Sequence, residues 1–309
     1  MTNEYEDVLR DVAGAVPTAI VLDAGLATSM KTHAFRAAYP NRYFNLGIAE
    51  QHAVSFASGL ARRGFIPLLH SFSNFLARRA HDQIAISVCW PRCNVKLIAG
   101  SCGVFDGRNG PSHMATDDLA AMAALPNMVV VEPGDKRQLR GLLRRVLATN
   151  GPAYVRVRRF GAPENLLPDH PDDDGTHVFH RCDDARVTLV VGGSLLCEGL
   201  LAVKVLADRD IPVDAIHVAV LKPLDAEAIL SSAVRSRLVV SVENHVASGG
   251  FSDAVARAIG GLGVRHARCT LPDTAIPAGD AAWQLAYCRL DGVSIADFVE
   301  EYVRKGQHV

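Results

Sequence analysis

The sequence of 309 residues has almost no net charge, no long apolar run and no paired-cysteine pattern. Its 32 basic and 33 acidic side chains are mixed along the chain, giving a formal net charge of -1. No basic stripe is present to follow the phosphates of a nucleic acid, so we expect no nucleic-acid partner. No apolar run reaches the roughly 18 uninterrupted residues that a membrane helix requires, so we expect no membrane partner either.

The cysteines also exclude some classes of protein. Seven cysteines form an odd, scattered set that fits neither a disulfide framework nor paired zinc clusters. They indicate free thiols in a reducing compartment. Residues 1–12 carry Glu4, Glu6, Asp7 and Asp11 where a secretory signal would be basic and then apolar. We therefore expect a cytoplasmic protein.

Several nucleotide and metal motifs are missing as well. No G-x-G-x-x-G fingerprint follows a first strand, and there is no G-x-x-x-x-G-K-[ST] phosphate loop. There is no H-E-x-x-H, and the C-x3-C of Cys89 and Cys93 is a weak match to ligand spacing. The sequence disfavours a self-contained nucleotide enzyme and predicts no metal site within this chain.

What is present is a repeated pattern of short apolar runs separated by stretches of helical period. This pattern is typical of βαβ units around a mostly parallel sheet, so the predicted fold class is α/β. The length favours two domains, each with a parallel sheet flanked by helices. In the first half, strands are expected at 18–22, 65–70, 94–99, 128–132 and 153–157.

Two helices of the first half are visible in the pattern. One presents Ala49, Ala53, Phe56, Ala57 and Leu60 on a single face, and Gly64 would end it in a left-handed cap. The other should follow Asp135.

The composition changes after about residue 160. Residues 161–184 are rich in proline, aspartate and glycine and are predicted to be a linker between a first domain at 1–160 and a second at 185–309. In the second domain, strands are expected at 187–191, 213–220, 238–243 and 264–269.

The region 45–113 contains three segments with chemical potential. Glu50 opens a helix in Asn45-Leu46-Gly47-Ile48-Ala49-Glu50-Gln51-His52, two phenylalanines lie three apart in Ser71-Phe72-Ser73-Asn74-Phe75, and a histidine ends Gly110-Pro111-Ser112-His113. Taken alone, each segment has an ordinary structural explanation. A glutamate in a first turn is favoured by the helix dipole, paired phenylalanines are usually core, and a histidine after a turn is usually on the surface.

In this order and spacing, the segments resemble the pyrimidine-binding domain of transketolases. The likeness extends through Leu22-Asp23-Ala24, Arg79-Ala80, Asp82-Gln83-Ile84 and Leu125-Pro126-Asn127. Residues 239–250 (VVSVENHVASGG) resemble the family's C-terminal domain. The resemblance therefore spans nearly the whole chain and implies a pyrimidine-binding thiamine diphosphate fold followed by a transketolase C-terminal domain.

The resemblance implies a role for each matching residue. Glu50 would hydrogen-bond the ring nitrogen of the cofactor's aminopyrimidine and promote the imino form that acts as a base. Phe72 and Phe75 would form the aromatic wall for that ring, with Phe75 the better candidate for stacking, and Arg79 would also lie at the cofactor. His113 would hydrogen-bond the substrate oxygen as charge develops on it. The carbon chemistry itself would belong to thiamine diphosphate.

The substrate contacts depart from the family pattern. The arginine expected near the start of the domain is missing around Thr2, Ser101 stands where a histidine is usual, and Asn109 stands where an aspartate is usual. Gly25 and Met114 are further departures, whereas Ser29 and Arg159 remain as candidate anion contacts. Ser29, Ser101, Asn109, His113 and Arg159 are the predicted substrate-binding residues. We expect a substrate that differs from the usual pentose phosphates, and a non-phosphorylated one stays open.

The family's Gly-Asp-Gly motif and distant asparagine, which hold magnesium and the diphosphate, have no match here. The resemblance thus implies a partner subunit that supplies the Mg²⁺ ligands, in a split transketolase of α2β2 form that transfers a two-carbon ketol unit.

Three alternatives remain open at this point. The beta subunit of a 2-oxoacid dehydrogenase has the same layout, but Gly110–His113 and Leu125–Asn127 favour transketolase. A fragment of 1-deoxyxylulose-5-phosphate synthase is disfavoured by the spacing of residues 71–75. A noncatalytic assembly or regulatory subunit is disfavoured because the acid, the aromatic pair and the histidine occur together.

Overall fold

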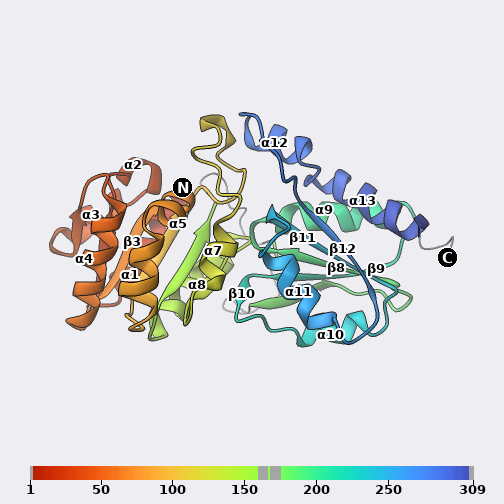
Figure 1. Ribbon diagram of the computed structural model, residues 1–309, viewed down its shortest axis with the longest axis horizontal. Helices are drawn as coiled ribbons and strands as arrows, with labels where there is room; N and C mark the ends of the chain where they lie inside the picture. Colours follow the sequence, from red (N-terminus) through yellow and green to blue (C-terminus); the bar gives the residue numbers. More distant parts are fainter. Residues whose placement is uncertain (1–2, 159–165, 168–174, 306–309) are drawn as a thin grey trace.

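The computed structural model describes residues 3–158, 166–167 and 175–305, and these form two sheets that lie beside each other with helices packed around them (Figure 1). The first sheet has seven strands in the order β10-β5-β6-β4-β3-β1-β2. All pairings in it are parallel except that of β10. Its strands are β1 (Ala19–Asp23), β2 (Tyr43–Asn45), β3 (Ile66–Phe72), β4 (Lys96–Gly100), β5 (Val129–Val131), β6 (Ala153–Val157) and β10 (Val220–Lys222).

Alternate side chains of these strands enter two apolar layers, as the period of two requires. Ile20 and Leu22 join the layer of α4 (Glu50–Arg62), α5 (Ser73–Arg79) and α7 (Asp118–Ala124). Ala19 and Val21 join the layer of α1 (Asn3–Gly14), α3 (His33–Ala38) and α8 (Lys136–Ala148). The shorter helices of this half are α2 (Ala27–Met30), η1 (Pro40–Arg42), α6 (His81–Gln83), the π-helical η2 (Ile84–Cys89) and η3 (Gly107–Asn109).

The second sheet has five strands in the order β12-β11-β8-β9-β7, of which only β7 pairs antiparallel. Its strands are β7 (Thr176–His180), β8 (Val187–Gly192), β9 (Val213–Val218), β11 (Leu238–Val246) and β12 (Arg265–Leu271). Its helices are η4 (Gly193–Leu195), α9 (Leu196–Asp208), α10 (Glu227–Ala233), α11 (Phe251–Ile259), α12 (Ala281–Tyr287) and α13 (Gly292–Lys305). The predicted α/β class with two mostly parallel sheets is confirmed.

The predicted helix signals also have counterparts in the structure. α4 ends at Arg62, and Gly64 follows with the left-handed φ of 89° that its cap requires. The side chain of Asp135 accepts a hydrogen bond from Gln138 N and so caps α8.

Two expectations were wrong in detail. Residues 176–180, assigned to the linker, form the edge strand β7 of the second sheet. The strand expected at 213–220 is two strands, because the chain leaves the second sheet after Val218 and β10 pairs with β5 of the first sheet. Both pieces are apolar, so composition alone does not reveal the change of sheet. One apolar cluster also continues across both halves, from Ile20 to Ile259.

Two global expectations can be compared with the described residues. None of their helices is both long and apolar enough to span a membrane. All seven cysteines lie within the described ranges, and each is a free thiol.

Candidate active site

The predicted site residues that the structure describes follow the carboxyl ends of neighbouring parallel strands of the first sheet. Ser29 follows β1, Glu50 follows β2, Phe75 follows β3, and His113 follows β4. The chain passes from β1 to β2 on one side and then to β3 on the other, so the sheet has a topological switch point beside β1. Ligands of open α/β sheets bind in the crevice outside such a point.

Glu50 is a buried carboxylate at the first position of α4, with an exposed fraction of 4%. A turn delivers it there: Asn45 Oδ1 accepts from Gly47 N at 3.0 Å, and Gly47 has a φ of 72°. The helix dipole favours a negative side chain in this turn. Arg79 Nη1 donates to Glu50 Oε1 at 2.9 Å, so the charge has a counterion.

The same arginine covers the aromatic wall. Its guanidinium carbon lies 3.7 Å from the centre of the Phe75 ring, in cation–π contact, while 46% of its side chain is exposed. Phe75 itself is buried on α5, which starts directly after β3, and its ring belongs to the apolar cluster that includes Phe72 and Ile98. The structure therefore brings Glu50, Phe75 and Arg79 together.

His113 lies against the same wall. Its ring centre is 5.5 Å from that of Phe72 and 5.3 Å from that of Phe75, both in edge contacts, and the two phenylalanine rings are 5.4 Å apart. Ser112 Oγ is hydrogen-bonded to His113 Nδ1 at 2.9 Å, and Asn74 Nδ2 donates to the carbonyl of Ser112. The histidine thus has one ring nitrogen fixed by its neighbour in the sequence and its loop fixed by α5.

The predicted substrate contacts Ser101 and Asn109 both bind Asp106. Ser101 Oγ donates to Asp106 Oδ2 at 2.9 Å, and Asn109 Nδ2 donates to Oδ1 at 3.2 Å. Ser101 is fully buried with a φ of 62°, whereas Asn109 is exposed. In this conformation the Ser101 hydroxyl supports the loop, and a substrate role for it stays a prediction. Asp106 is a central residue of this loop that the sequence did not single out.

Ser29 and Arg159 are less closely tied to this centre. Ser29 is half-buried on α2, after a turn in which Gly25 packs on Ile48, two residues before Glu50. Arg159 lies outside the described residues. The neighbouring Arg158 is described. The guanidinium of Arg158 lies 4.0 Å from the centre of the Phe105 ring, and burial lowers the pKa of Arg158.

A buried carboxylate beside an aromatic ring fits a flat heterocycle that both stacks and donates hydrogen bonds. Phe75 offers the ring, Glu50 the acceptor, and His113 a polar group at the rim. In this conformation the guanidinium of Arg79 lies over the face of the Phe75 ring. A metal ion would need several donor side chains close together, and within the described ranges no group of three or more His, Cys, Asp or Glu residues is placed to hold one.

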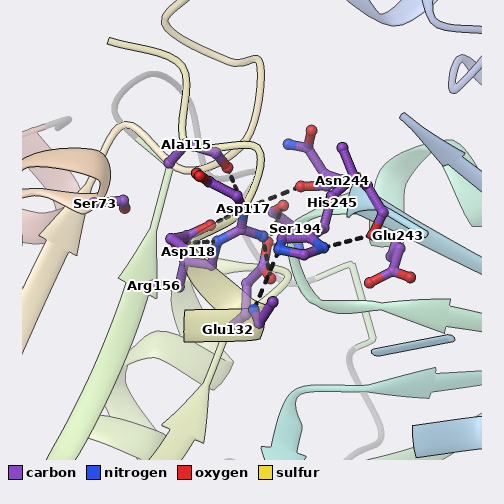
Figure 2. A network of polar contacts seen from close by, with 12 residues as sticks. Ser73, Ala115, Asp117, Asp118, Glu132, Arg156, Ser194, Glu243, Asn244 and His245 are labelled. Carbon is purple, nitrogen blue, oxygen red and sulfur yellow. Dashed lines mark hydrogen bonds and ion pairs between the residues drawn. The ribbon is translucent and has the colours of Figure 1, made fainter. Parts of the chain in front are cut away.

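A network of buried charges adjoins the site, and the sequence did not predict it (Figure 2). Arg156 on β6 is fully buried and donates to both oxygens of Asp118, to Glu132 Oε2 at 2.8 Å, and to the carbonyls of Ala115 and Asn244. Although burial opposes its charge, the two carboxylates raise the pKa of Arg156 well above its ordinary value. Side chains alternate between the two faces of a strand, so the spacing of Tyr154 and Arg156 could have placed both on one face of a buried strand.

Family models match both halves of the chain. The family model "Transketolase, pyrimidine binding domain" matches residues 1–163, and "Transketolase, C-terminal domain" matches 177–295. A putative transketolase C-terminal section from Methanocaldococcus jannaschii is 33% identical, with 99% of this chain and 96% of that protein covered. A 6-deoxy-6-sulfo-D-fructose transketolase subunit from Clostridium sp. is 34% identical, with 84% and 80% covered.

Other relatives are longer than this chain. It is 32% identical to 1-deoxy-D-xylulose-5-phosphate synthase 2 of Geobacter sulfurreducens and spans 48% of that protein. Among solved structures, a split gene transketolase described as an inactive beta4 tetramer superposes with a TM-score of 0.85 at 34% identity, covering 97% of this chain and 96% of that one. This chain belongs to the transketolase family, and its two halves are the family's pyrimidine-binding and C-terminal domains.

Proposed function

We propose that this chain is one subunit of a split transketolase, which transfers a two-carbon ketol unit from a ketose donor to an aldehyde acceptor. The observation that carries the proposal is the buried carboxylate of Glu50 beside the Phe75 ring, with His113 on the same aromatic pair. Thiamine diphosphate, when bound, supplies the electron sink for breaking and forming carbon–carbon bonds next to a carbonyl. The family match supports this choice of cofactor.

The residues of this chain would bind and orient the reacting groups. Glu50 would hold a proton at the ring nitrogen of the aminopyrimidine, and Phe75 would carry the face of that ring, with Phe72 beside it. Arg79 balances the charge of Glu50 until the heterocycle arrives. His113 would donate to the substrate oxygen as negative charge builds on it, which is the stage at which a fixed donor lowers a barrier most.

The Mg²⁺ ligands and the diphosphate site are assigned to an N-terminal partner subunit, in an α2β2 assembly. Two names support a partner: one relative is called a putative transketolase C-terminal section, and a similar solved structure is described as a split gene transketolase, inactive beta4 tetramer. A subunit that carries half of a site has no activity alone, and that expectation applies to this chain.

The substrate is proposed to differ from the usual pentose phosphates. Ser101 replaces a histidine on the phosphate side and is buried on Asp106, so it offers no cation to an anionic group. One relative is named a 6-deoxy-6-sulfo-D-fructose transketolase subunit, and this name supports a sugar other than a pentose phosphate. Turnover of xylulose 5-phosphate and ribose 5-phosphate by the reconstituted pair at ordinary transketolase efficiency would reject this part.

Glu50 variants test the catalytic role. In the pair reconstituted with thiamine diphosphate and Mg²⁺, we expect Glu50→Ala and the isosteric Glu50→Gln to lower ketol transfer by about 10²-fold or more, as loss of a positioned acid–base group does. Glu301→Ala, at an exposed glutamate of α13, is the matched control and should keep full activity. A noncatalytic subunit would tolerate all three changes. Turnover of 2-oxoacids instead of ketoses would favour the dehydrogenase alternative.

A further inference from the structure

The loop between β4 and α7, residues 101–117, belongs to the first half in sequence but packs on the second half. Its apolar side chains Cys102, Val104, Phe105 and Met114 are part of the apolar cluster formed by β8, β11, β12 and α13. The same loop carries Asp106, Asn109 and His113. The placement of the histidine therefore depends on the C-terminal domain as well as on the first sheet.

Asn244, near the end of β11, binds one side of the base of this loop directly and the other side through Arg156. Its side-chain Oδ1 accepts from Val104 N at 3.1 Å. Its main-chain oxygen accepts from Arg156 Nη2 at 3.0 Å, and the same Nη2 donates to the carbonyl of Ala115 at 2.9 Å. Figure 2 shows the guanidinium of Arg156 below Ala115 and Asn244, with Ala115 to its upper left and Asn244 to its upper right. The segment from Val104 to Ala115 is thus bound at each end.

The fit of the loop onto this amide is close. Gly103 has a φ of 55°, and a Cβ built on it would lie 2.1 Å from the Asn244 side chain. Only glycine allows this approach, so the loop and the amide are matched in shape as well as in hydrogen bonding. Ala115 N also donates to Gly103 O at 2.9 Å and closes the base of the loop.

The amide of Asn244 has one group that is paired and one that is not. Its Nδ2 is buried and has no acceptor among the described residues. Its Oδ1 accepts from the buried Val104 N, so an apolar side chain of similar size would leave that N–H without an acceptor. What the amide adds is a fixed position for the backbone at Val104.

We infer that Asn244 is a positioning residue, through which the C-terminal domain holds the loop of His113 in its working place. The far end of the loop is fixed by Asn74 and by the contacts of His113 with Phe72 and Phe75. Glu50 and Arg79 lie on α4 and α5, outside this loop, so loosening it would leave their ion pair in place. A displacement of about 1 Å at a reacting group can lower a rate by about 100-fold.

The inference rests on the proposed function, and its test separates the two. In the reconstituted pair, Asn244→Ala should lower kcat about 10- to 100-fold while the thiamine diphosphate affinity stays within about twofold. Hydrogen exchange of this chain alone should become at least about tenfold faster in the peptide 103–115, because Val104 N loses its acceptor. Ser241→Ala is the control: Ser241 lies on the same strand as Asn244, and the change removes its hydrogen bonds to Ser252 and His266 without touching the loop.

Each outcome has a defined meaning. If Asn244→Ala and Ser241→Ala lower kcat equally, or if the exchange of 103–115 is unchanged in Asn244→Ala, the positioning role is wrong. If the wild-type pair transfers no ketol unit, the proposed function fails, but the exchange measurement still decides whether Asn244 holds the loop. Should Asn244→Ala not fold, Asn244→Ser has a shorter hydroxyl that does not reach Val104 N, and the same results are expected from it.

Discussion

Arg79 donates a hydrogen bond to the buried carboxylate of Glu50, with 2.9 Å between Nη1 and Oε1. The pair is asymmetric, since Glu50 is 4% exposed and the Arg79 side chain 46%. The buried carboxylate of the candidate catalytic acid is therefore paired with a side chain that is nearly half exposed to solvent.

The pair predicts a coupling that can be measured without activity. Arg79→Met keeps a long side chain over Phe75 but removes the counterion, and we expect it to lower the free energy of unfolding by about 1 kcal/mol or less, as for other partly exposed pairs. In a Glu50→Gln background the same change should cost clearly less. Urea unfolding of the four proteins of this cycle gives the coupling, and equal losses in both backgrounds would contradict the ion pair.

Arg156 should be the most sensitive charged position of the chain. Arg156→Met leaves the buried carboxylates of Asp118 and Glu132 without their counterion, and we expect a loss of about 3–5 kcal/mol in the free energy of unfolding. Arg268→Met breaks the partly exposed pair with Asp253 and should cost less than about 1 kcal/mol. A denaturant titration in which both variants lose the same stability would refute the role given to Arg156.

Gly103 tests the contact between the loop and the C-terminal domain. Gly103→Ala places a Cβ 2.1 Å from Asn244 at a left-handed φ, so the loop has to shift. Gly64→Ala is matched, because its φ of 89° is also left-handed but nothing lies within 4 Å of the added atom. We expect backbone strain to lower the free energy of unfolding of both variants by about 1–2 kcal/mol, and crowding to lower that of Gly103→Ala by about 1–3 kcal/mol more. Only Gly103→Ala should lower activity, and equal thermal shifts in the two would argue against crowding.

Lys96 predicts a pH-dependent stability. Its Nζ donates to the carbonyls of Thr149 and Gly151, and burial lowers the pKa of Lys96 from 10.5 to about 7. Between pH 7 and 10.5 the unfolded chain binds one more proton at this lysine than the folded chain does, so the free energy of unfolding rises with pH over that range. Below pH 7 the lysine contributes no pH dependence. The difference between wild type and Lys96→Met should therefore shift in favour of wild type from pH 7 to 9.5.

The slope of that difference has an upper limit of about 1.4 kcal/mol per pH unit. Chemical unfolding at several pH values measures it directly. A difference that stays constant over this range would show that the buried amine keeps its ordinary pKa.

The sequence predicted most strands well, because their β-branched and apolar runs directly record burial, but it missed the short and mostly exposed β2. β6 has the predicted bounds of 153–157, and β1 and β3 are displaced by only one or two residues. The change of sheet at Val220 could not be predicted, because the residues on both sides of the change are equally apolar. β7 could not be predicted either, because its five residues are only half-buried and adjoin a stretch rich in proline and aspartate.

Site residues were predictable where the resemblance supplied a motif, and not where long-range pairing decides. Glu50 and Phe75 were placed by local sequence, but their common partner Arg79 is an ion-pairing residue only because β2 and β3 end at the same edge of the sheet. Arg156 lies in a run of arginines that suggests an exposed anion contact. Its burial depends on Asp118 and Glu132, which lie 38 and 24 residues away in the chain.

Binding of thiamine diphosphate is the most direct test of the central claim, that this chain holds the pyrimidine end of a coenzyme whose charged tail is held by another subunit. Calorimetric titration with thiamine diphosphate in the presence of Mg²⁺ should show tight binding to the reconstituted pair and weak or no binding to either subunit alone. In the pair, Glu50→Gln should abolish ketol transfer. A pair that does not bind the coenzyme, or full activity of this chain alone, would contradict the account.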